Sequence, residues 1–182
     1  MKNAYLLFHL NLAFSSIDKS SYQDVIKKCY WPLLRIAALD NYKINIELTG
    51  WTLEQIYSID KSWVLELKNL LSVGKVELIG SGYSQIIGPL NHFALNEKNQ
   101  QIGLETYREI LGVTPNIALA NEMALSSSMA DIYKKFNYSA LVMDGPNLER
   151  SSNFDRKKLN WLKGINQNIP IIDSDFILFQ KM

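Results

Sequence analysis

The sequence predicts an α/β fold, a mostly parallel sheet with helices outside it, in one domain that spans residues 1–182. Short apolar runs alternate along the chain with segments that repeat apolar residues at helical spacing, and this alternation is typical of parallel sheets. A hydrophobic fraction of 47% and a charged fraction of 20% exclude a disordered chain. The pattern fits both a β/α barrel and a doubly wound sheet, although 182 residues are few for a barrel, which usually needs more than about 200.

Three strands and three helices are predicted in the first half of the chain. The apolar runs that predict strands lie at residues 5–10, 43–48 and 76–79. Helical spacing predicts a helix over 22–34, in which Pro32 should cause a kink or a restart, and another helix over 60–71. Residues 52–55 match a capping box, so a further helix is expected to begin there. Gly74 is expected to end the 60–71 helix in the left-handed conformation.

The second half of the chain continues the alternation. A long helix is predicted over 96–111, ended by Gly112, and Ser126 to Ser128 can cap a helix that reaches Phe136. The polar region 147–168 is expected to be a long loop with a short helical piece at 156–162. Apolar runs predict strands at 117–120 and 138–143 and further apolar segments at 169–172 and 176–179.

Charge and cysteine content exclude several classes of protein. With 19 basic and 18 acidic side chains, the net charge of +1 gives no general attraction to nucleic acid or to an anionic membrane. Cys29 is the single cysteine, so no internal disulfide can form and a reducing compartment is indicated. His9 and Asn11 interrupt the apolar N-terminal stretch, which favours a buried strand over a signal peptide. No run approaches the roughly 18 apolar residues of a membrane span, and we therefore expect a cytoplasmic protein.

Polar and acidic residues follow the ends of the predicted strands. Because the carboxyl ends of parallel strands meet at one edge of a sheet, these residues should converge there. They are His9, Asn11, Glu47, Thr49, Ser81, Tyr83, Gln85, Asn121, Glu122, Asp144, Asp173 and Asp175. Such a set indicates a polyhydroxylated or charged ligand, the alternative being that loops are polar in any case. Trp51, just beyond the second strand, could stack on a sugar ring or belong to the core.

Glu122 is the strongest candidate for a catalytic residue. A carboxylate directly after an apolar strand is poorly solvated, so a nucleophile or an acid/base group is the functional interpretation. The alternative is an N-cap for the helix near Ser126, although the serines there already supply capping hydroxyls. With only His9 and His92 in the chain, no metal site of the usual histidine type is expected.

Several segments resemble glycoside hydrolase family 57, and together they span essentially the whole chain. Residues 74–85, Gly-Lys-Val-Glu-Leu-Ile-Gly-Ser-Gly-Tyr-Ser-Gln, resemble the second conserved region of that family. Residues 8–11, Phe-His-Leu-Asn, look like a diverged first region. Residues 120–124, Ala-Asn-Glu-Met-Ala, resemble the third region, in which the glutamate is the nucleophile. The order of helix, strand and acidic end up to residues 138–144 is similar to the family's, as is the segment 169–181.

The resemblance implies an incomplete (β/α)7 barrel of the TIM type that acts on α-linked glucans or related oligo- and polysaccharides, as a hydrolase or a glucanotransferase. It also implies retention of anomeric configuration and no cofactor or metal. By motif, Glu122 becomes the nucleophile, while His9 and Glu77 fall in regions that shape the substrate site; Glu77 could instead be a buried structural carboxylate. The other residues expected to bind substrate are Asn11, Glu47, Trp51, Tyr83, Gln85, Asn121 and Asp144.

The chain departs from the family pattern at three places. Asn11-Leu12-Ala13 replaces His-Gln-Pro, Gln85 stands where many members have a histidine, and Asn121 precedes the nucleophile. These changes keep open the alternative of a non-catalytic carbohydrate-binding relative. A further alternative is a polysaccharide deacetylase, which shares the barrel type and uses a metal held by an aspartate and two histidines.

The family's acid/base aspartate lies in a fourth region, after the segment that 169–181 resembles. We therefore expect this residue beyond position 182 and expect the isolated chain to be inactive; Asp144, Asp173 and Asp175 have no flanks that resemble the fourth region. An open sheet edge near Phe179 should favour association of the isolated chain, whose oligomeric state the sequence does not predict.

Overall fold

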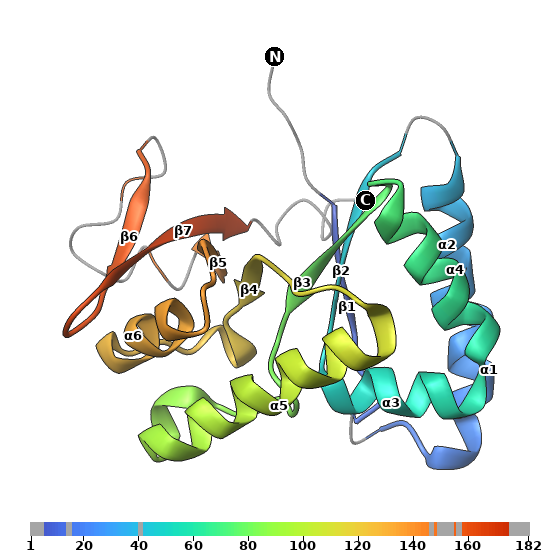
Figure 1. Cartoon of the computed structure of the whole chain (residues 1–182), viewed down its shortest axis with the longest axis horizontal. Helices are drawn as coiled ribbons and strands as arrows, with labels where there is room; N and C mark the ends of the chain where they lie inside the picture. The colour runs from blue at the N-terminus through green and yellow to red at the C-terminus, as the bar shows by residue number, and fades with distance from the viewer. Residues whose placement is uncertain are drawn as a thin grey trace.

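A seven-stranded sheet lies at the centre of the computed structural model, which describes residues 6–13, 16–39, 42–145, 148, 155 and 158–174. The strand order is β1-β2-β3-β4-β5-β7-β6 (Figure 1). The strands are β1 (Leu7–Leu10), β2 (Ile44–Leu48), β3 (Val76–Gly80), β4 (Ile117–Leu119), β5 (Ala140–Asp144), β6 (Asn160–Lys163) and β7 (Asn168–Ser174). Neighbouring strands are parallel except β6 and β7, which are antiparallel. The predicted α/β class with a mostly parallel sheet is confirmed.

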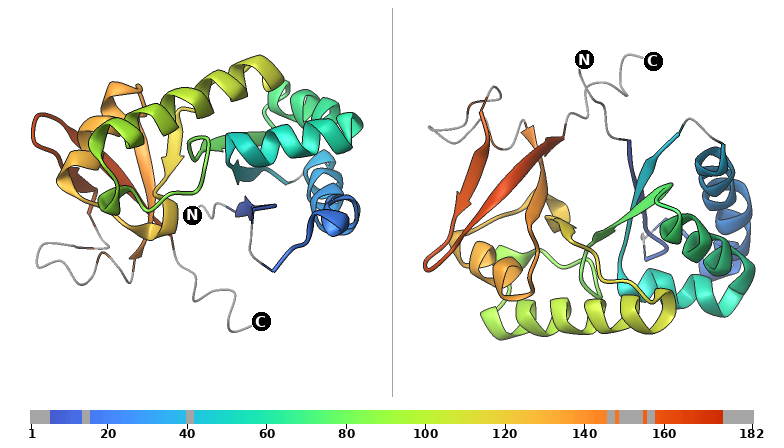
Figure 2. Two further views of the ribbon diagram at one scale, coloured as in Figure 1. Left: turned by 90° about the horizontal axis from the view of Figure 1, so that it is seen from below. Right: turned by 45° about the horizontal axis from the view of Figure 1, so that its top comes forward.

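The strand order also decides between a barrel and a doubly wound sheet. Strands β1 to β5 are neighbours in chain order, so right-handed crossovers place the connecting helices on the same face of the sheet. A doubly wound sheet would instead reverse direction at a switch point. Figure 2 shows the curved sheet that results, with the helices outside it. Within the described residues, β1 and β6 are the two edges, so the barrel wall is open.

Among the described residues, seven helical segments with complete bounds cover the outside of the sheet. They are α1 (Tyr22–Val25), the π-helical turn η2 (Ile26–Tyr30), α2 (Trp31–Ala38), α3 (Gly50–Ile59), α4 (Lys61–Ser72), α5 (Phe93–Leu111) and α6 (Ser127–Lys135). Short 3₁₀ turns lie at η1 (Lys19–Ser21), η3 (Gly88–Leu90) and η4 (Asn121–Met123). In Figure 1, α1, α2 and α4 stack to the right of the sheet, while α3 and α5 lie side by side below it.

The two faces of the sheet carry different cores. Between the sheet and the helices lies one large apolar core, in which Trp63 and Tyr107 are fully buried. The opposite, inner face carries a smaller cluster of Ile79, Leu119 and Val142. This inner face lines the open barrel, and the polar strand ends described below lie at its carboxyl edge.

The capping box predicted at residues 52–55 is wrong, because α3 begins two residues earlier, at Gly50. The N-cap is Thr49, whose Oγ1 accepts the backbone N–H of Thr52 at 3.1 Å. Thr49 directly follows β2, so the helix starts at the first side chain after the strand that can cap it. The left-handed conformation predicted for Gly74 is confirmed, with φ of 71°.

The predicted restart at Pro32 is confirmed, since the π-helical turn gives way to α2 with Pro32 in its first turn. Helix α5 begins at Phe93, three residues before the expected start. Here His92 is the N-cap, and its Nδ1 accepts the backbone N–H of Ala94 at 3.3 Å. The helix ends as predicted at Gly112, which has φ of 77°.

The helical piece predicted at 156–162 is wrong where the structure describes it, because Asn160–Lys163 form β6 and pair with β7. The turn between these strands is held from α6. There the Asp131 carboxylate accepts the backbone N–H groups of Ile165, Asn166 and Gln167 at 2.8–3.2 Å. A contact more than 30 residues away along the chain leaves no local pattern in the sequence. Asp175, the apolar run 176–179 and the sheet edge expected near Phe179 lie outside the described residues.

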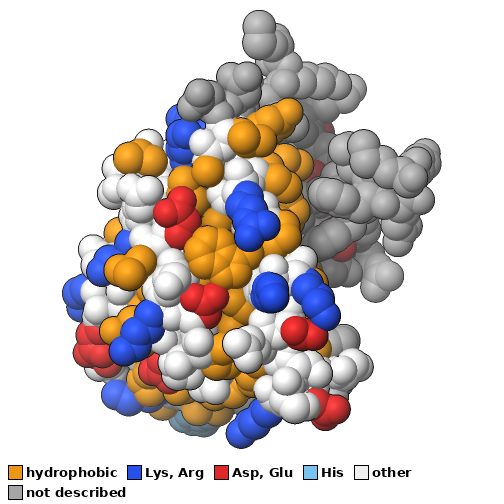
Figure 3. Space-filling model, turned by 90° about the vertical axis from the view of Figure 1, so that its right-hand side faces the viewer, with side chains coloured by type: hydrophobic (Ala, Val, Ile, Leu, Met, Phe, Trp, Pro, Cys, Tyr) orange, Lys and Arg blue, Asp and Glu red, His pale blue; other side chains and the backbone are white. Residues whose placement is uncertain are grey.

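The face that carries α1, α2 and α4 has a mixed surface. In Figure 3, Lys and Arg side chains on this face are interspersed with Asp, Glu and hydrophobic ones. The exposed hydrophobic residues of α2 and α4 include Ile36 and Leu65. Across the part of the chain that the structure describes, no helix combines the length and the apolar character needed to span a membrane.

Candidate active site

The candidate site begins with a pair of side chains at the carboxyl ends of β1 and β2. The parallel register sets His9 beside Glu47, and His9 Nδ1 is hydrogen-bonded to Glu47 Oε2. The Glu47 side chain is 0% exposed, whereas 41% of the His9 side chain is exposed. The imidazole therefore lies between a fully buried carboxylate and the open mouth of the barrel.

Glu47 controls the charge of His9. The hydrogen bond with Glu47 raises the pKa of His9 above its ordinary value, although burial of the ring acts in the opposite direction. The negative charges of Glu47 and Glu122 raise this pKa further. Glu47 Oε1 is buried and, among the described residues, has no hydrogen-bond partner. The positive charge of His9 is thus the main compensation for a carboxylate that water does not reach.

A second group of side chains reaches Glu122 through two amides. Asn11 Nδ2 donates to Gln85 Oε1 at 2.6 Å, and Gln85 Nε2 donates to Glu122 Oε1 at 2.6 Å. At the other end, Asn11 Oδ1 accepts the backbone N–H of Ala13 at 2.9 Å. Three predicted site residues from three separate strand ends therefore form one hydrogen-bonded chain, which we call the amide chain.

Glu122 itself lies in the turn η4 directly after β4, and its side chain is exposed. Both Glu122 and Met123 adopt left-handed backbone conformations, with φ of 54° and 50°. Non-glycine residues in this region cost of order 1–3 kcal/mol each and concentrate at functional sites. The alternative that Glu122 caps the next helix is wrong, because the N-cap of α6 is Ser126, four residues further on.

Asn121 holds this turn against the loop that follows β3. Its side chain is buried, its Nδ2 donates to the Ser81 backbone oxygen at 2.9 Å, and its Oδ1 accepts from Ser81 Oγ at 2.7 Å. The polar atoms of Asn121 are therefore engaged within the fold, one residue before the carboxylate that faces the open site.

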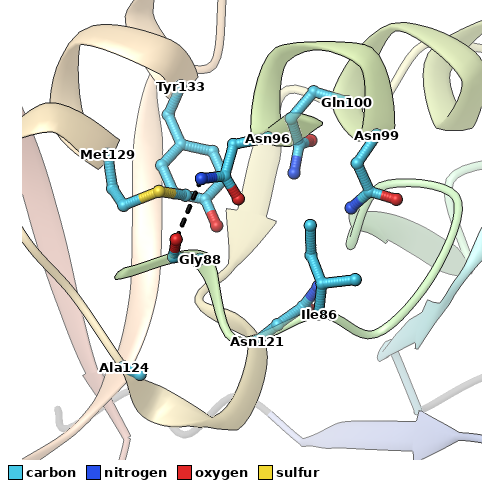
Figure 4. A pocket seen from close by; sticks show the side chains of 9 residues that line it. All are labelled: Ile86, Gly88, Asn96, Asn99, Gln100, Asn121, Ala124, Met129 and Tyr133. Atoms are coloured by element: carbon cyan, nitrogen blue, oxygen red, sulfur yellow. Dashed lines mark hydrogen bonds between the residues drawn. The ribbon is translucent and has the colours of Figure 1, made fainter. Parts of the chain in front are cut away.

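The loop after β3 is anchored from below by α5. Asn99 Oδ1 accepts the backbone N–H of Ser84 at 2.8 Å, and Asn99 Nδ2 donates to the Ser84 oxygen at 3.0 Å. Asn96 Nδ2 donates to the Gly88 oxygen at 2.9 Å, as Figure 4 shows. The small cavity between this loop, α5 and α6 is lined by Ile86, Gly88, Asn96, Asn99, Gln100, Asn121, Ala124, Met129 and Tyr133 (Figure 4).

The sequence analysis missed these α5 amides. Asn96, Asn99 and Gln100 are buried, with 4%, 7% and 3% of each residue exposed. Their spacing of three and four residues puts them on one helix face, and that spacing was the available signal. A buried amide stripe is informative because buried polar groups need partners. The partners of Asn96 and Asn99 belong to the loop that carries Gln85, and Gln100 Oε1 accepts from the Tyr138 hydroxyl at 3.2 Å.

Trp51 and Tyr83, two of the expected substrate-binding residues, make their contacts with helices. Trp51 is half-buried, packs against the large core and meets Tyr22 of α1 edge-on, with 6.3 Å between ring centroids. The Tyr83 hydroxyl donates to Glu54 Oε2 of α3 at 2.9 Å. Neither side chain is hydrogen-bonded to Glu122.

Glu77 and Asp144 lie apart from the amide chain. Glu77 is exposed. It lies two residues before Ile79, which is in register with Glu47, so Glu77 is about 7 Å further towards the amino end of the strands than Glu47. Its exposure argues against the alternative of a buried structural carboxylate. Asp144 ends β5 at the same edge as the site; its Oδ1 is buried and unpartnered within the described part of the chain. Asp173 of β7 is exposed.

A metal site of the deacetylase type does not form from the described residues. Among them, no group of three or more His, Cys, Asp or Glu side chains is placed to hold a metal ion. The two histidines have separate roles, since His9 pairs with Glu47 and His92 caps α5.

A curated protein is similar to this chain in sequence. The protein, "Putative alpha-amylase" from Methanocaldococcus jannaschii, is 27% identical over 139 residues, which are 72% of this chain and 29% of that protein. The chain thus spans about three tenths of the length of the curated relative it matches.

Solved structures share the fold. The 4-alpha-glucanotransferase from Thermococcus litoralis has a TM-score of 0.82 at 15% identity, with 97% of this chain and 29% of that chain covered. The alpha-amylase AmyC from Thermotoga maritima has a TM-score of 0.75 at 11% identity, over 94% of this chain and 45% of that chain. A family 4 carbohydrate esterase from Streptomyces lividans has a TM-score of 0.52 at 13% identity, over 82% of this chain and 69% of that chain. The predicted incomplete (β/α)7 barrel is confirmed.

The family follows from the sequence itself. The family model described as "Glycosyl hydrolase family 57" matches residues 2–173, which include all the strands and helices described above except Ser174, the last residue of β7. The first, second and third motifs, with His9, Gln85 and Glu122, all fall within this match. This chain belongs to glycosyl hydrolase family 57.

Proposed function

We propose that this chain forms the nucleophile-bearing part of the catalytic barrel of a retaining enzyme that acts on α-linked glucans or related polysaccharides, with Glu122 as the nucleophile. The observation that carries the proposal is the left-handed turn at Glu122, which presents an exposed carboxylate at the strand ends beside two fixed partners. Strain of this kind persists where the surrounding structure over-determines it, and here Asn121 and Gln85 do so.

In a retaining mechanism the two catalytic carboxyl groups stand about 5–5.5 Å apart. Glu122 attacks the anomeric carbon and forms a glycosyl-enzyme, while the second carboxyl group protonates the departing oxygen. That group then takes a proton from the incoming water or sugar hydroxyl, whose oxygen displaces Glu122. We propose that the second group is an aspartate outside the described residues, in the fourth motif of the family.

His9 supplies the second partner of the proposed site. An imidazolium held by Glu47 through Nδ1 leaves its Nε2–H as a donor for a sugar hydroxyl. The similar structures named above include a 4-alpha-glucanotransferase and an alpha-amylase, so the acceptor can be water or another sugar.

Replacement of the nucleophile tests the proposal. In protein expressed from the complete reading frame, Glu122→Gln should lower turnover of maltooligosaccharides by about 10³-fold or more, while circular dichroism shows a folded protein. The matched control is Glu109→Gln, which makes the same change on an exposed residue of α5 and should leave turnover unchanged.

Azide rescue identifies the role of Glu122 more directly. Azide can replace a missing carboxylate nucleophile, so Glu122→Ala with azide should release a glycosyl azide of inverted configuration from an activated glycoside. Turnover that survives in both Glu122 variants would refute the assignment.

A non-catalytic carbohydrate-binding relative is the second candidate, and the neutral amides at Asn11 and Gln85 favour it. Titration calorimetry separates the two functions. Binding of maltooligosaccharides by the wild-type protein with no turnover supports the binding relative, whereas turnover that depends on Glu122 supports the enzyme. The deacetylase is disfavoured, because His9 and His92 lie on separate elements with other partners.

A further inference from the structure

We propose that Asn11 and Gln85 are positioning residues for Glu122, and that the amide chain selects which carboxylate oxygen is free to react. This inference rests on the proposed function only in taking Glu122 as the nucleophile. It assigns a role to two residues that do not touch the reacting carbon. The contacts that carry it can be followed in order, from the backbone to Glu122.

The direction of the amide chain is set at Asn11. A backbone N–H can only donate, and that of Ala13 lies 2.9 Å from Asn11 Oδ1. The carbonyl end of the Asn11 amide must therefore face Ala13. Its NH₂ end then faces Gln85 Oε1, at 2.6 Å, and donates to it.

The same logic fixes the orientation of Gln85. Because Gln85 Oε1 accepts from Asn11, the NH₂ end of this amide is the part that reaches Glu122. Gln85 Nε2 donates to Glu122 Oε1 at 2.6 Å. A reversed Gln85 would place two NH₂ donors against each other at Asn11 and two oxygen acceptors against each other at Glu122, so the observed orientation is the only one that satisfies all three groups.

The amide chain leaves one carboxylate oxygen engaged and the other available. Glu122 Oε1 accepts from Gln85, whereas Oε2 accepts no hydrogen bond from any residue that the structure describes. An exposed glutamate on a turn would otherwise sample several rotamers and present either oxygen. Fixing Oε1 lowers this freedom and directs Oε2 to the anomeric carbon, which is the gain that correct orientation gives to a reaction.

The middle of the amide chain and its Glu122 end rest on anchored backbone. Residues 83 and 84 are held by Asn99, which accepts the Tyr83 N–H on its backbone oxygen at 2.9 Å and the Ser84 N–H on Oδ1 at 2.8 Å. Asn121 fixes the turn beneath Glu122. The two amides therefore hold the Glu122 carboxylate in an orientation that is determined by this anchored backbone.

Asn11→Asp is the most informative variant, because it is nearly isosteric and does not touch Glu122. A carboxylate at this position cannot donate, so Gln85 must turn its NH₂ end towards it and its oxygen towards Glu122. In the complete protein we expect kcat to fall by about 10–100-fold, with KM changed less than about threefold. The control Asn69→Asp makes the same chemical change on exposed α4 and should leave both constants unchanged.

Asn11→Ala, Gln85→Ala and the double variant test whether the two residues act as one unit. If they do, each single variant lowers kcat by a similar factor and the double variant lowers it little further. Independent, multiplicative effects would overturn the proposal.

A nuclear magnetic resonance measurement keeps this inference separable from the proposed function. The side-chain NH₂ resonances of Gln85 should shift in Asn11→Asp and in Glu122→Gln, and should not shift in Asn69→Asp. Unmoved resonances in Asn11→Asp would overturn the amide chain even if Glu122 proves to be the nucleophile. Shifted resonances in a protein whose turnover does not depend on Glu122 would retain the amide chain and refute the enzyme.

Discussion

His9 and Asn11 lie two residues apart at the carboxyl end of β1, and they interact with Glu122 in different ways. His9 is paired with a fully buried carboxylate, and the hydrogen bond with Glu47 raises the pKa of His9 above its ordinary value. Asn11 is neutral and acts through a second neutral amide, Gln85, by direct hydrogen bonds of 2.6 Å. His9 interacts with the Glu122 carboxylate through its charge, whereas Asn11 determines the orientation of that carboxylate through Gln85.

The difference has consequences for stability and for pH dependence. A buried charge pair is costly to break, because the remaining partner is left without compensation in a medium that solvates it poorly. A neutral amide that is partly exposed can exchange its lost partner for water at little cost. The His9–Glu47 pair should therefore control folding stability, and the amide chain should control turnover.

The largest expected effect is on stability, from His9→Ala. Removal of the imidazole leaves Glu47 buried and unpaired, and we expect a loss of about 2–3 kcal/mol in the free energy of unfolding at pH 7. This value lies below the range of about 3–5 kcal/mol for fully buried pairs, because the His9 side chain is 41% exposed and water screens part of the interaction. Urea denaturation measures it.

The double variant His9→Ala/Glu47→Gln supplies the control for this prediction. Since glutamine is uncharged and similar in shape, the double variant should recover most of the lost stability. Asn11→Ala should cost only about 0.5–1 kcal/mol by the same measurement. If the double variant is as unstable as His9→Ala, the buried charge is not the cause.

The convergence of these side chains could be predicted from the sequence, for a general reason. The carboxyl ends of parallel strands meet at one edge of a sheet. His9, Glu47 and Gln85, which lie at the ends of separate strands, were therefore expected together with Glu122. The pairing within the set could not be predicted. It depends on the register of β1 against β2 and on two left-handed residues after β4, which residue types such as Glu and Met do not signal.

Features determined by distant contacts were also missed. The stripe of buried amides on α5 has the same spacing as an ordinary exposed helix face, and its partners, the folded loop and Tyr138, are distant in the sequence or formed only on folding. Strand β6 lacks a strong local signal, and its pairing with β7 is supported by Asp131 of α6. In both cases, tertiary hydrogen bonds override the local pattern.

Gly103→Ala should disturb the amide chain and spare the charge pair. A Cβ atom on Gly103 of α5 would lie 2.7 Å from Gly82 Cα and from Tyr83 N, so the loop that carries Gln85 must move. Such overpacking costs about 2 kcal/mol, and we expect kcat to fall with it. Thermal denaturation and steady-state kinetics measure the two effects.

Gly112→Ala is the matched control on the same helix. Nothing lies within 4 Å of its Cβ position, so the cost comes only from its φ of 77° and amounts to about 1 kcal/mol. Turnover should be unchanged. A Gly103→Ala enzyme with normal kcat would show that the position of this loop does not matter.

The contribution of the His9–Glu47 pair to stability should depend on pH, whereas that of the amide chain should not. Because Glu47 raises the pKa of His9 above 6.5, the stabilisation from this pair is fully present below pH 6.5 and is lost as the pH rises through the folded-state pKa. The stability difference between wild type and Glu47→Gln should therefore be widest near about pH 6 and shrink towards about pH 9. The difference between wild type and Gln85→Leu should stay constant, since amides do not titrate. Denaturation curves across this range check both, and a constant difference for Glu47→Gln would contradict the charged pair.

The smallest expected effect is from Asp24→Asn, which breaks an ion pair in water. Lys28 Nζ lies 2.7 Å from Asp24 Oδ2, and the side chains are 68% and 64% exposed. The hydrogen bond and charge of Lys28 lower the pKa of Asp24, yet solvent and salt screen so exposed a pair. Its loss should leave the urea midpoint within experimental error at pH 7. A shift as large as that of His9→Ala would show that pairing, and not burial, makes the His9–Glu47 contact important.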